Sequence, residues 1–147
     1  MRTIEFRGKS NDRGKWIIGS LRIDPDTVSA FISNFKYSID EDRWKREWFE
    51  EPVRVDTVGQ YTGIDDMNKN RIFEGDIVRA FIPKDEAENE YTLVKGYVFF
   101  EKGSFCIKED MISPPLINVA PTPGQNIRIE IIGNVYDGVK QDETKEN

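Results

Sequence analysis

The 147-residue chain contains no histidine and only one cysteine, Cys106, and both shortages exclude chemistry. Histidine is the commonest general acid–base and metal ligand in proteins, so its absence removes Ser-His and Cys-His nucleophile systems. A single cysteine cannot form an internal disulfide, which predicts a reducing, cytoplasmic location. Cys106 stands between two apolar residues of a strand-like run, which favours a small packed side chain over a reactive thiol.

Long apolar runs and phosphate-binding glycine motifs are missing as well. No segment approaches the roughly 18 apolar residues of a spanning helix, and the first ten residues lack the apolar region of a secretory signal. The chain contains neither G-x-x-x-x-G-K-[ST] nor G-x-G-x-x-G. We therefore expect no membrane association, no cofactor and no enzymatic activity.

Charge is distributed unevenly along the chain. Residues 1–55 hold 11 Lys and Arg against 10 Asp and Glu, whereas residues 56–147 hold 10 against 17. Because affinity for a phosphate backbone comes mainly from Lys and Arg, the acidic second part is a poor match for nucleic acid. A nucleic-acid partner is therefore not expected from the charge balance.

One short segment keeps a nucleic-acid alternative open. Trp44 and Trp48 are interleaved with three basic residues, Arg43, Lys45 and Arg46. Basic residues beside aromatic side chains can stack bases, so a nucleic-acid-associated protein using this segment is one alternative function. Acidic neighbours at 40–42 and 47 balance the charge, which favours a solvated or protein-binding segment.

The polar stretch between two apolar runs near the middle of the chain resembles the start of a calcium-binding loop. Asp66, Asn68 and Asn70 match the first three ligand positions of an EF-hand. The motif then requires Gly at its sixth position and Glu at its twelfth, where this chain has Arg71 and Ile77. We expect a solvated turn here and no metal.

A second alternative function is a hydrolase with a metal held by carboxylates. The candidate ligands are Asp65, Asp66 and Glu74, which lie in or beside predicted turns. Adjacent acids in turns usually bond the backbone, and the chain has no histidine to complete such a site. The expected set of catalytic residues and metal ligands is therefore empty.

Runs of β-branched and aromatic residues, separated by turn formers, predict a mainly β fold with minor α. Gly75 and Asp76 predict a tight corner that begins a strand at Ile77, with Gly75 at positive φ. Further strands are expected at 3–7, 16–21, 44–55, 91–100 with a break or bulge at Gly96, 104–108 and 127–135.

Four segments together resemble the YopX family of small phage and prophage proteins. They are FRGKSNDRGKWIIGSL at 6–21, TVGQYTGIDDMNKNRIFEGDIV at 57–78, GYVFFEKGSFCI at 96–107 and IEIIGNVYD at 129–137. The resemblance implies a mainly β fold with an SH3-like barrel in the C-terminal half, a bacterial host cytoplasm and no established activity.

The residues that carry the resemblance are interpreted as structural or interaction residues. They are Gly59, Gln60, Tyr61, Thr62, Gly63, Glu74, Gly75, Asp76, Gly133 and Asn134. Asn70 stands where the family pattern has Gly, and since Asn tolerates left-handed backbone we expect a left-handed turn there. Residues 28–35 fit helical spacing as well as a short strand, and the family resemblance favours the strand.

The sequence predicts an N-terminal β-hairpin subdomain at 1–55, an SH3-like small barrel at 56–138 and a disordered tail at 139–147. The expected role is a phage or prophage accessory protein that acts as a non-catalytic protein-interaction module and homo-oligomer. Strand edges and aromatic residues, among them Trp16, Trp44 and Trp48, are the expected interface. A host or phage protein is the alternative partner.

Overall fold

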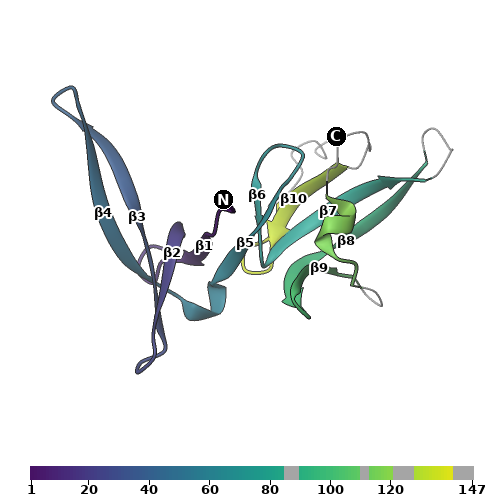
Figure 1. The fold of residues 1–147 in the computed structure, drawn as a ribbon, viewed down its shortest axis with the longest axis horizontal. Coiled ribbons are helices and arrows are strands. Elements are labelled where there is room, and N and C mark those ends of the chain that lie inside the picture. Colours follow the sequence, from purple (N-terminus) through teal and green to yellow (C-terminus); the bar gives the residue numbers. More distant parts are fainter. Residues whose placement is uncertain (85–89, 110–112, 121–127, 141–147) are drawn as a thin grey trace. The chain divides into compact units, whose positions relative to one another are not determined.

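The computed structural model describes residues 1–84, 90–109, 113–120 and 128–140. Within them it contains eleven β-strands and two short 3-10 helices, so the predicted mainly β fold is confirmed (Figure 1). The chain divides into two compact units, Met1–Tyr61 and Thr62–Asn147. Of the tail predicted at 139–147, residues 141–147 lie outside the described residues. None of the helices among those residues has the length and apolar character to cross a membrane.

The first unit is an antiparallel sheet with the strand order β4-β3-β2-β1-β5. Its elements are β1 (Phe6–Lys9), β2 (Trp16–Asp24), β3 (Ser29–Asp40), β4 (Arg43–Val53), the 3-10 helix η1 (Val55–Thr57) and the start of β5 (Gly59–Asp65). Each of the first three strands is joined to the next by a hairpin turn, which is the simplest connection between antiparallel strands, and η1 leads from β4 to β5 on the far side of β1.

The ambiguous segment at 28–35 is a strand. β3 begins at Ser29, and Val28 lies in the preceding turn with φ of +56°, a value that no right-handed helix contains. The Asp24 carboxylate accepts a hydrogen bond from the Asp26 N–H at 2.9 Å and so fixes the turn. Local turn chemistry therefore decided between the two periodicities.

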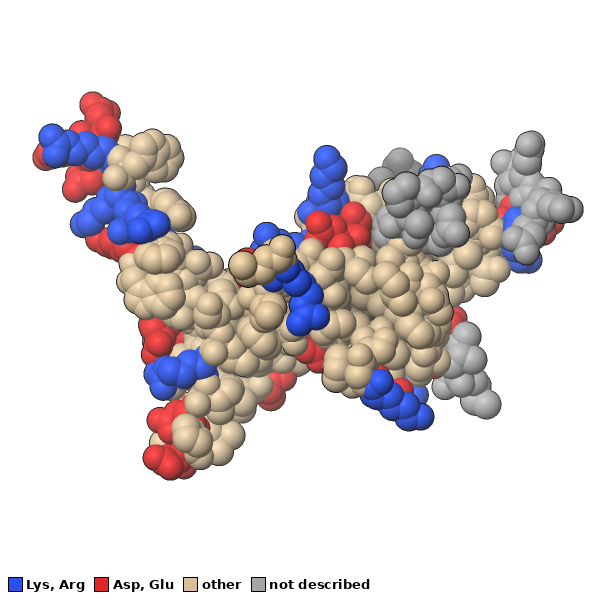
Figure 2. Space-filling model, in the orientation of Figure 1, with Lys and Arg blue, Asp and Glu red and all other residues tan. Residues whose placement is uncertain are grey.

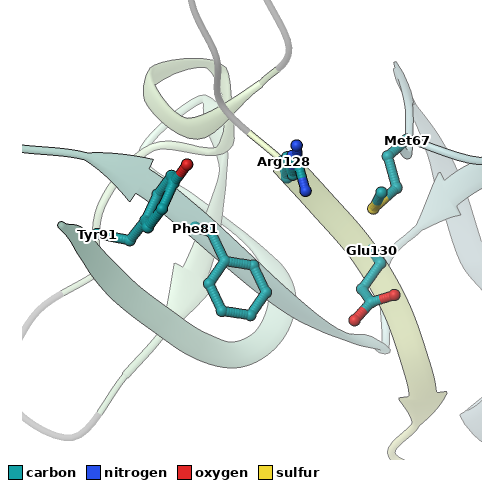
Figure 3. Close-up of a pocket in the computed structure, with 5 residues that line it drawn as sticks. All are labelled: Met67, Phe81, Tyr91, Arg128 and Glu130. Carbon is teal, nitrogen blue, oxygen red and sulfur yellow. The ribbon is translucent and has the colours of Figure 1, made fainter. Parts of the chain in front are cut away.

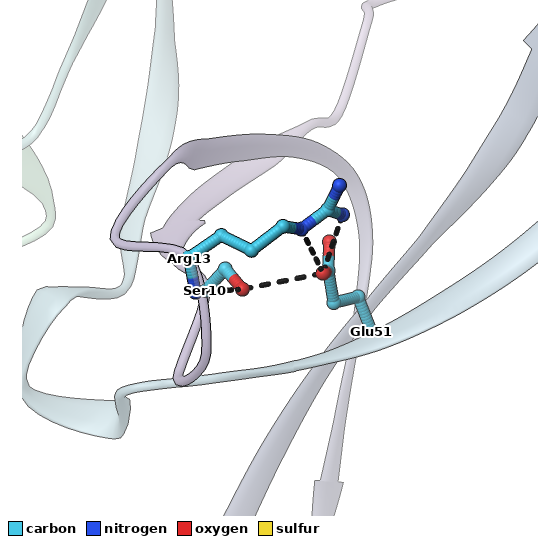
Figure 4. Close-up of polar contacts among 3 residues, drawn as sticks. All are labelled: Ser10, Arg13 and Glu51. Carbon is cyan, nitrogen blue, oxygen red and sulfur yellow. Dashed lines mark hydrogen bonds and ion pairs between the residues drawn. The ribbon is translucent and has the colours of Figure 1, made fainter.

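The core of the first unit is small. Ala30, Ile32 and Val53 are buried, with Phe6 and Ile17 among the residues packed against them. The loop between β1 and β2 is tied to β4 by Glu51. Its Oε1 accepts hydrogen bonds from Ser10 Oγ at 3.2 Å and from Arg13 Nη2 at 2.6 Å (Figure 4). These contacts anchor the base of β4.

The second unit contains a five-stranded antiparallel sheet with the order β11-β10-β7-β8-β9. Its elements, after the end of β5, are β6 (Arg71–Phe73), β7 (Asp76–Pro83), β8 (Tyr91–Glu101), β9 (Ser104–Lys108), the 3-10 helix η2 (Leu116–Val119), β10 (Arg128–Asn134) and β11 (Gly138–Val139). Ordered structure thus extends to Val139, the residue at which the tail was expected to begin.

The predicted SH3-like barrel is not confirmed, because this sheet is open. Its outer strands, β9 and β11, are not paired with each other among the described residues. β11 has only two residues, which is too short to close a barrel, and β10 shifts register between Ile131 and Gly133. The register shift is a β-bulge-like irregularity within a strand of this open sheet.

Alternating apolar residues form the core of the second unit. Val78 and Ala80 of β7 are fully buried, and Cys106 is buried as expected. The break or bulge predicted at Gly96 is wrong, since β8 pairs continuously with β7. Gly96 is required for another reason: a Cβ there would lie 2.0 Å from the Lys108 carbonyl oxygen. The core residues are Ile72, Val78, Ala80, Val94, Val98, Ile107, Leu116, Val119 and Ile129.

Candidate interaction surface

The outer part of the β3–β4 hairpin is a two-stranded ribbon. β3 and β4 are paired along their length, from Ala30 with Val53 to Asp40 with Arg43. β2 accompanies β3 only as far as Ser33, and beyond it no other described strand pairs with the ribbon. Figure 1 shows it extending from the sheet of the first unit. Within the part of the chain that the structure describes, both edges of this ribbon are therefore unpaired.

One face of this ribbon is aromatic. Directly paired residues of an antiparallel ladder point to the same side, and the register pairs Phe35 with Trp48, Tyr37 with Arg46 and Ile39 with Trp44. Trp44 is 77% exposed and Trp48 56%. Figure 2 shows tan side chains on one side of the ribbon and charged side chains on the other. The aromatic face consists of Phe35, Tyr37, Ile39, Trp44 and Trp48.

Contacts within the aromatic face support the ribbon. The Phe35 and Trp48 rings meet edge-on with their centroids 4.9 Å apart, and the Arg46 guanidinium lies 4.3 Å from the Phe35 ring centroid. An isolated two-stranded hairpin is marginally stable in water, so such cross-strand contacts are needed to hold it. Trp44 and Ile39, near the tip, are both mostly exposed.

Several charged side chains of the ribbon form ion pairs. Lys45 Nζ lies 2.7 Å from a Glu47 carboxylate oxygen, and this contact lowers the pKa of Glu47 and raises that of Lys45. At the base, Arg22 of β2 donates to Glu50 at 2.5 Å and lowers the pKa of Glu50. All four groups are well exposed, so solvent screens these pairs and they contribute little to stability.

The structure places Trp44 and Trp48 on one surface but not Trp16. The Trp16 ring is half-buried beneath Arg7, whose guanidinium carbon lies 4.5 Å from the ring centroid. Sequence reasoning missed Tyr37 and Ile39. Their alternation with Phe35, combined with a two-residue turn after residue 40, would have placed them opposite the tryptophans.

The residues that carry the YopX resemblance mostly fix turns and strand ends of the second unit. Thr62 Oγ1 donates to the Ile72 carbonyl at 2.8 Å, and Asp76 Oδ2 accepts from the Phe73 N–H at 2.8 Å. Gly75 has φ of +88°, which confirms the predicted left-handed corner. Its carbonyl accepts from the Val135 N–H at 2.8 Å, so the corner also holds the end of β10.

The remaining residues of this set also lie in strands and turns, where they support the backbone. Gly59 and Gln60 pair with β1, and Tyr61 is buried. A Cβ on Gly133 would lie 2.2 Å from the Gly138 carbonyl oxygen. Asn134 Oδ1 accepts from two backbone N–H groups of the turn that follows. Gly63 has positive φ, and Glu74 lies in the turn beside Gly75.

The Asp66 carboxylate is bonded to backbone rather than presented to a ligand. Its Oδ1 accepts from the N–H groups of Asn68 and Asn70 at 2.9 Å, and its Oδ2 from Ile131 at 3.2 Å. The left-handed residue of this turn is Lys69 with φ of +64°, so the expectation for Asn70 is wrong. Among the described ranges, no three acidic or cysteine side chains form a group that could hold a metal.

The second unit also contains an open pocket of about 400 Å³ (Figure 3). It is lined by Met67, Phe81, Tyr91, Arg128 and Glu130. The Glu130 carboxylate is neutralised by Arg79, whose Nε lies 3.0 Å from it. Apolar walls and one exposed arginine give little specificity, so the aromatic face is the stronger candidate surface.

These features define a class of mainly β protein with two antiparallel sheets and a projecting aromatic ribbon. The chain belongs to the YopX family, whose model, described as YopX protein, matches residues 5–140. Among solved structures, it resembles the crystal structure of protein EF1440 from Enterococcus faecalis with a TM-score of 0.53 and 19% identity, covering 92% of this chain and 94% of that one. This likeness concerns the fold alone. No curated protein matches the chain.

Proposed function

We propose that this protein is a non-catalytic protein-interaction module, phage- or prophage-encoded, that acts as a homo-oligomer. The observation that carries the proposal is the aromatic face of the β3–β4 ribbon. Large apolar side chains gathered on one exposed surface mark interaction sites, whereas single exposed apolar residues are ordinary. Trp, Tyr and Arg are also the residues that most often dominate binding energy at interfaces.

The size of the aromatic face suits a modest homomeric interface. A buried aromatic side chain covers roughly 150–250 Å², so the exposed fractions of its four aromatic residues leave roughly 500 Å² available per chain. Two copies would together bury about 1,000 Å², which is the lower limit for a specific interface. Neighbouring contacts are therefore needed as well, and assembly should depend on protein concentration.

The two alternative functions receive less support. Residues 35–50 contain four cations and five acids, so the ribbon offers no net positive charge to a phosphate backbone. For a carboxylate-metal hydrolase, Asp66 would have to give up three backbone hydrogen bonds to bind an ion. A protein partner is the occupant that best fits an aromatic surface of balanced charge.

Light scattering coupled to size exclusion, from low to high micromolar protein, tests the proposal. We expect a mass that is a multiple of 17.1 kDa and decreases on dilution. Trp44→Ser should raise the protein concentration at which half of the oligomer dissociates by at least tenfold. Ile117→Ser is the matched control, because Ile117 is 66% exposed but lies in η2, outside the ribbon.

A single mass near 17.1 kDa across the whole range would refute the homo-oligomer. A pull-down that captures one host or phage protein on the wild type but not on Trp44→Ser would then assign the surface to a foreign partner. A mobility shift of nucleic acid that weakens with salt and requires Trp44 would instead support the nucleic-acid alternative.

A further inference from the structure

The charges along β4 are ordered in two blocks. Three cations occupy its first part and three acids its second part, in the order Arg43, Lys45, Arg46, Glu47, Glu50 and Glu51. β4 is the outer strand of the sheet of the first unit. Natural edge strands often carry charges that discourage pairing, and here the charges are sorted by sign along the strand.

Only the base of the β4 edge is covered. There the Asn11 N–H donates to the Pro52 carbonyl at 3.2 Å, and Ser10 forms a bridge with Val53. Among the described residues no strand lies beside the outer edge of β4 at residues 43–51. A row of unpaired N–H and C=O groups of this length is a template for a further strand.

The order of charges selects the strand that fits. If a second β4 lies antiparallel to the first, the cationic block of each copy faces the acidic block of the other. A parallel arrangement would instead place like charges together. Opposite charges on neighbouring strands stabilise a sheet and like charges destabilise it, and an antiparallel pair of identical strands is the arrangement that a two-fold axis generates.

We propose that the β4 edge pairs antiparallel with the β4 edge of a second copy about a two-fold axis, forming a β3-β4-β4′-β3′ sheet. This inference rests on the proposed function, because it specifies how the homo-oligomer is built. Glu47 is the midpoint of the open stretch at 43–51 and therefore lies at the axis, where the two Glu47 carboxylates face each other and each has the partner's Lys45 on its diagonal, while Arg43 of each chain lies opposite the partner's Glu51. The aromatic faces of the two ribbons then lie side by side on one continuous sheet, and they are buried where that sheet packs against a second pair of copies.

The existing ion pairs permit this exchange of partners. Lys45 and Glu47 are each more than half exposed, as is Arg22, while its partner Glu50 is 37% exposed. Exposed pairs contribute little, so a partner strand can replace or extend them. Glu51 is less free to change partners, because its carboxylate accepts hydrogen bonds from Ser10 and Arg13 at the base of the ribbon. Arg46 stacks on Phe35 and is best left unchanged in any test.

Two charge-reversal variants test the pairing directly. Arg43→Glu with Lys45→Glu makes the open edge acidic, and Glu47→Lys with Glu50→Lys makes it basic. For each variant alone, the protein concentration at which half of the assembly dissociates should be at least tenfold higher than for the wild type. An equimolar mixture should restore assembly, as a heterodimer resolved by mass spectrometry. Neither variant removes a member of the aromatic face.

The outcomes separate this inference from the proposed function. If both variants alone assemble as the wild type does, the homo-oligomer stands but the β4 pairing is wrong. If each variant is weakened and the mixture is not restored, the charge complementarity is also refuted. If the wild type itself is monomeric throughout, the inference and the proposed function fail together.

Cysteine crosslinking provides a second measurement that needs no charge reversal. Glu47→Cys places a thiol near the axis, and Lys36→Cys places one directly across the hairpin on β3. A disulfide requires Cα atoms about 4.4–6.8 Å apart, so mild oxidation should link two Glu47→Cys chains and leave Lys36→Cys largely unlinked. Cys106 is buried and should not interfere. Equal yields, or a higher yield from Lys36→Cys, would overturn the proposal.

Discussion

Replacing Asp66 by alanine should strongly destabilise the second unit, because this one carboxylate joins the β5–β6 turn to β10. It accepts three backbone hydrogen bonds, two from the turn and one from Ile131, 65 residues further along the chain. Asp66 is only 5% exposed. In Asp66→Ala, water therefore cannot readily enter to accept the hydrogen bond that the Ile131 N–H loses.

The size of the effect follows from these contacts. A hydrogen bond to a charged group is worth about 1.5–3 kcal/mol, and we assign that to the part-buried Ile131 bond. The Asn68 and Asn70 N–H groups lie on exposed residues and can form hydrogen bonds with water instead. The loss of each of these two bonds should therefore cost about 1 kcal/mol of stability. Asp66→Ala should therefore lower the free energy of unfolding by about 3–5 kcal/mol.

Asp66→Asn refines the test. An amide oxygen can still accept from the two turn N–H groups, but the amide nitrogen would then face the Ile131 N–H, donor against donor. We expect a loss of about 1–3 kcal/mol, intermediate between the wild type and Asp66→Ala. Asp65→Ala, at the exposed neighbouring position, is the control and should change stability by less than about 1 kcal/mol.

Urea unfolding followed by tryptophan fluorescence and circular dichroism gives the free energies, with and without added Ca²⁺, Mg²⁺ or Zn²⁺. Equal stabilities for Asp66→Ala and Asp65→Ala would refute the structural role of Asp66. A concentration-dependent stabilisation of the wild type by one of these ions, lost in Asp66→Ala, would show instead that the carboxylate binds metal.

Three further predictions concern other sites. Gly75→Val should cost about 1–3 kcal/mol, since φ of +88° strains any β-branched residue, and an unchanged melting temperature would contradict it. Val28→Gly should stabilise by about 0.5–1 kcal/mol in urea unfolding, because Val28 is strained at positive φ and 62% exposed, and a loss of stability would show that its side chain is needed. The pKa values of Glu47 and Glu50 are lowered by Lys45 and Arg22, so their pairs are present above the ordinary glutamate pKa of 4.5 and are lost as pH falls through the lowered values. If these acids also pair across copies, light scattering should show weaker assembly as pH falls from about 6 to about 3.5, and assembly that is independent of pH would contradict this.

The sequence by itself determined most of the strands and several turns. Alternating apolar residues and β-branched runs specify strands locally, and glycine is the residue that adopts positive φ most easily, as Gly75 does. The burial of Cys106 was also predictable, because the residue lies inside an apolar run. The family followed from long motifs whose residues mainly shape turns and strand ends.

Only the tertiary structure decided how these strands are arranged. Local patterns do not state which strands pair at the ends of a sheet, so the open sheet in place of a barrel could not be foreseen. The role of Gly96 depends on the Lys108 carbonyl in a neighbouring strand, and that of Asp66 on Ile131 in β10. The aromatic face arises in the same way, because it is the register of β3 on β4 that places Tyr37 and Ile39 beside Trp44 and Trp48.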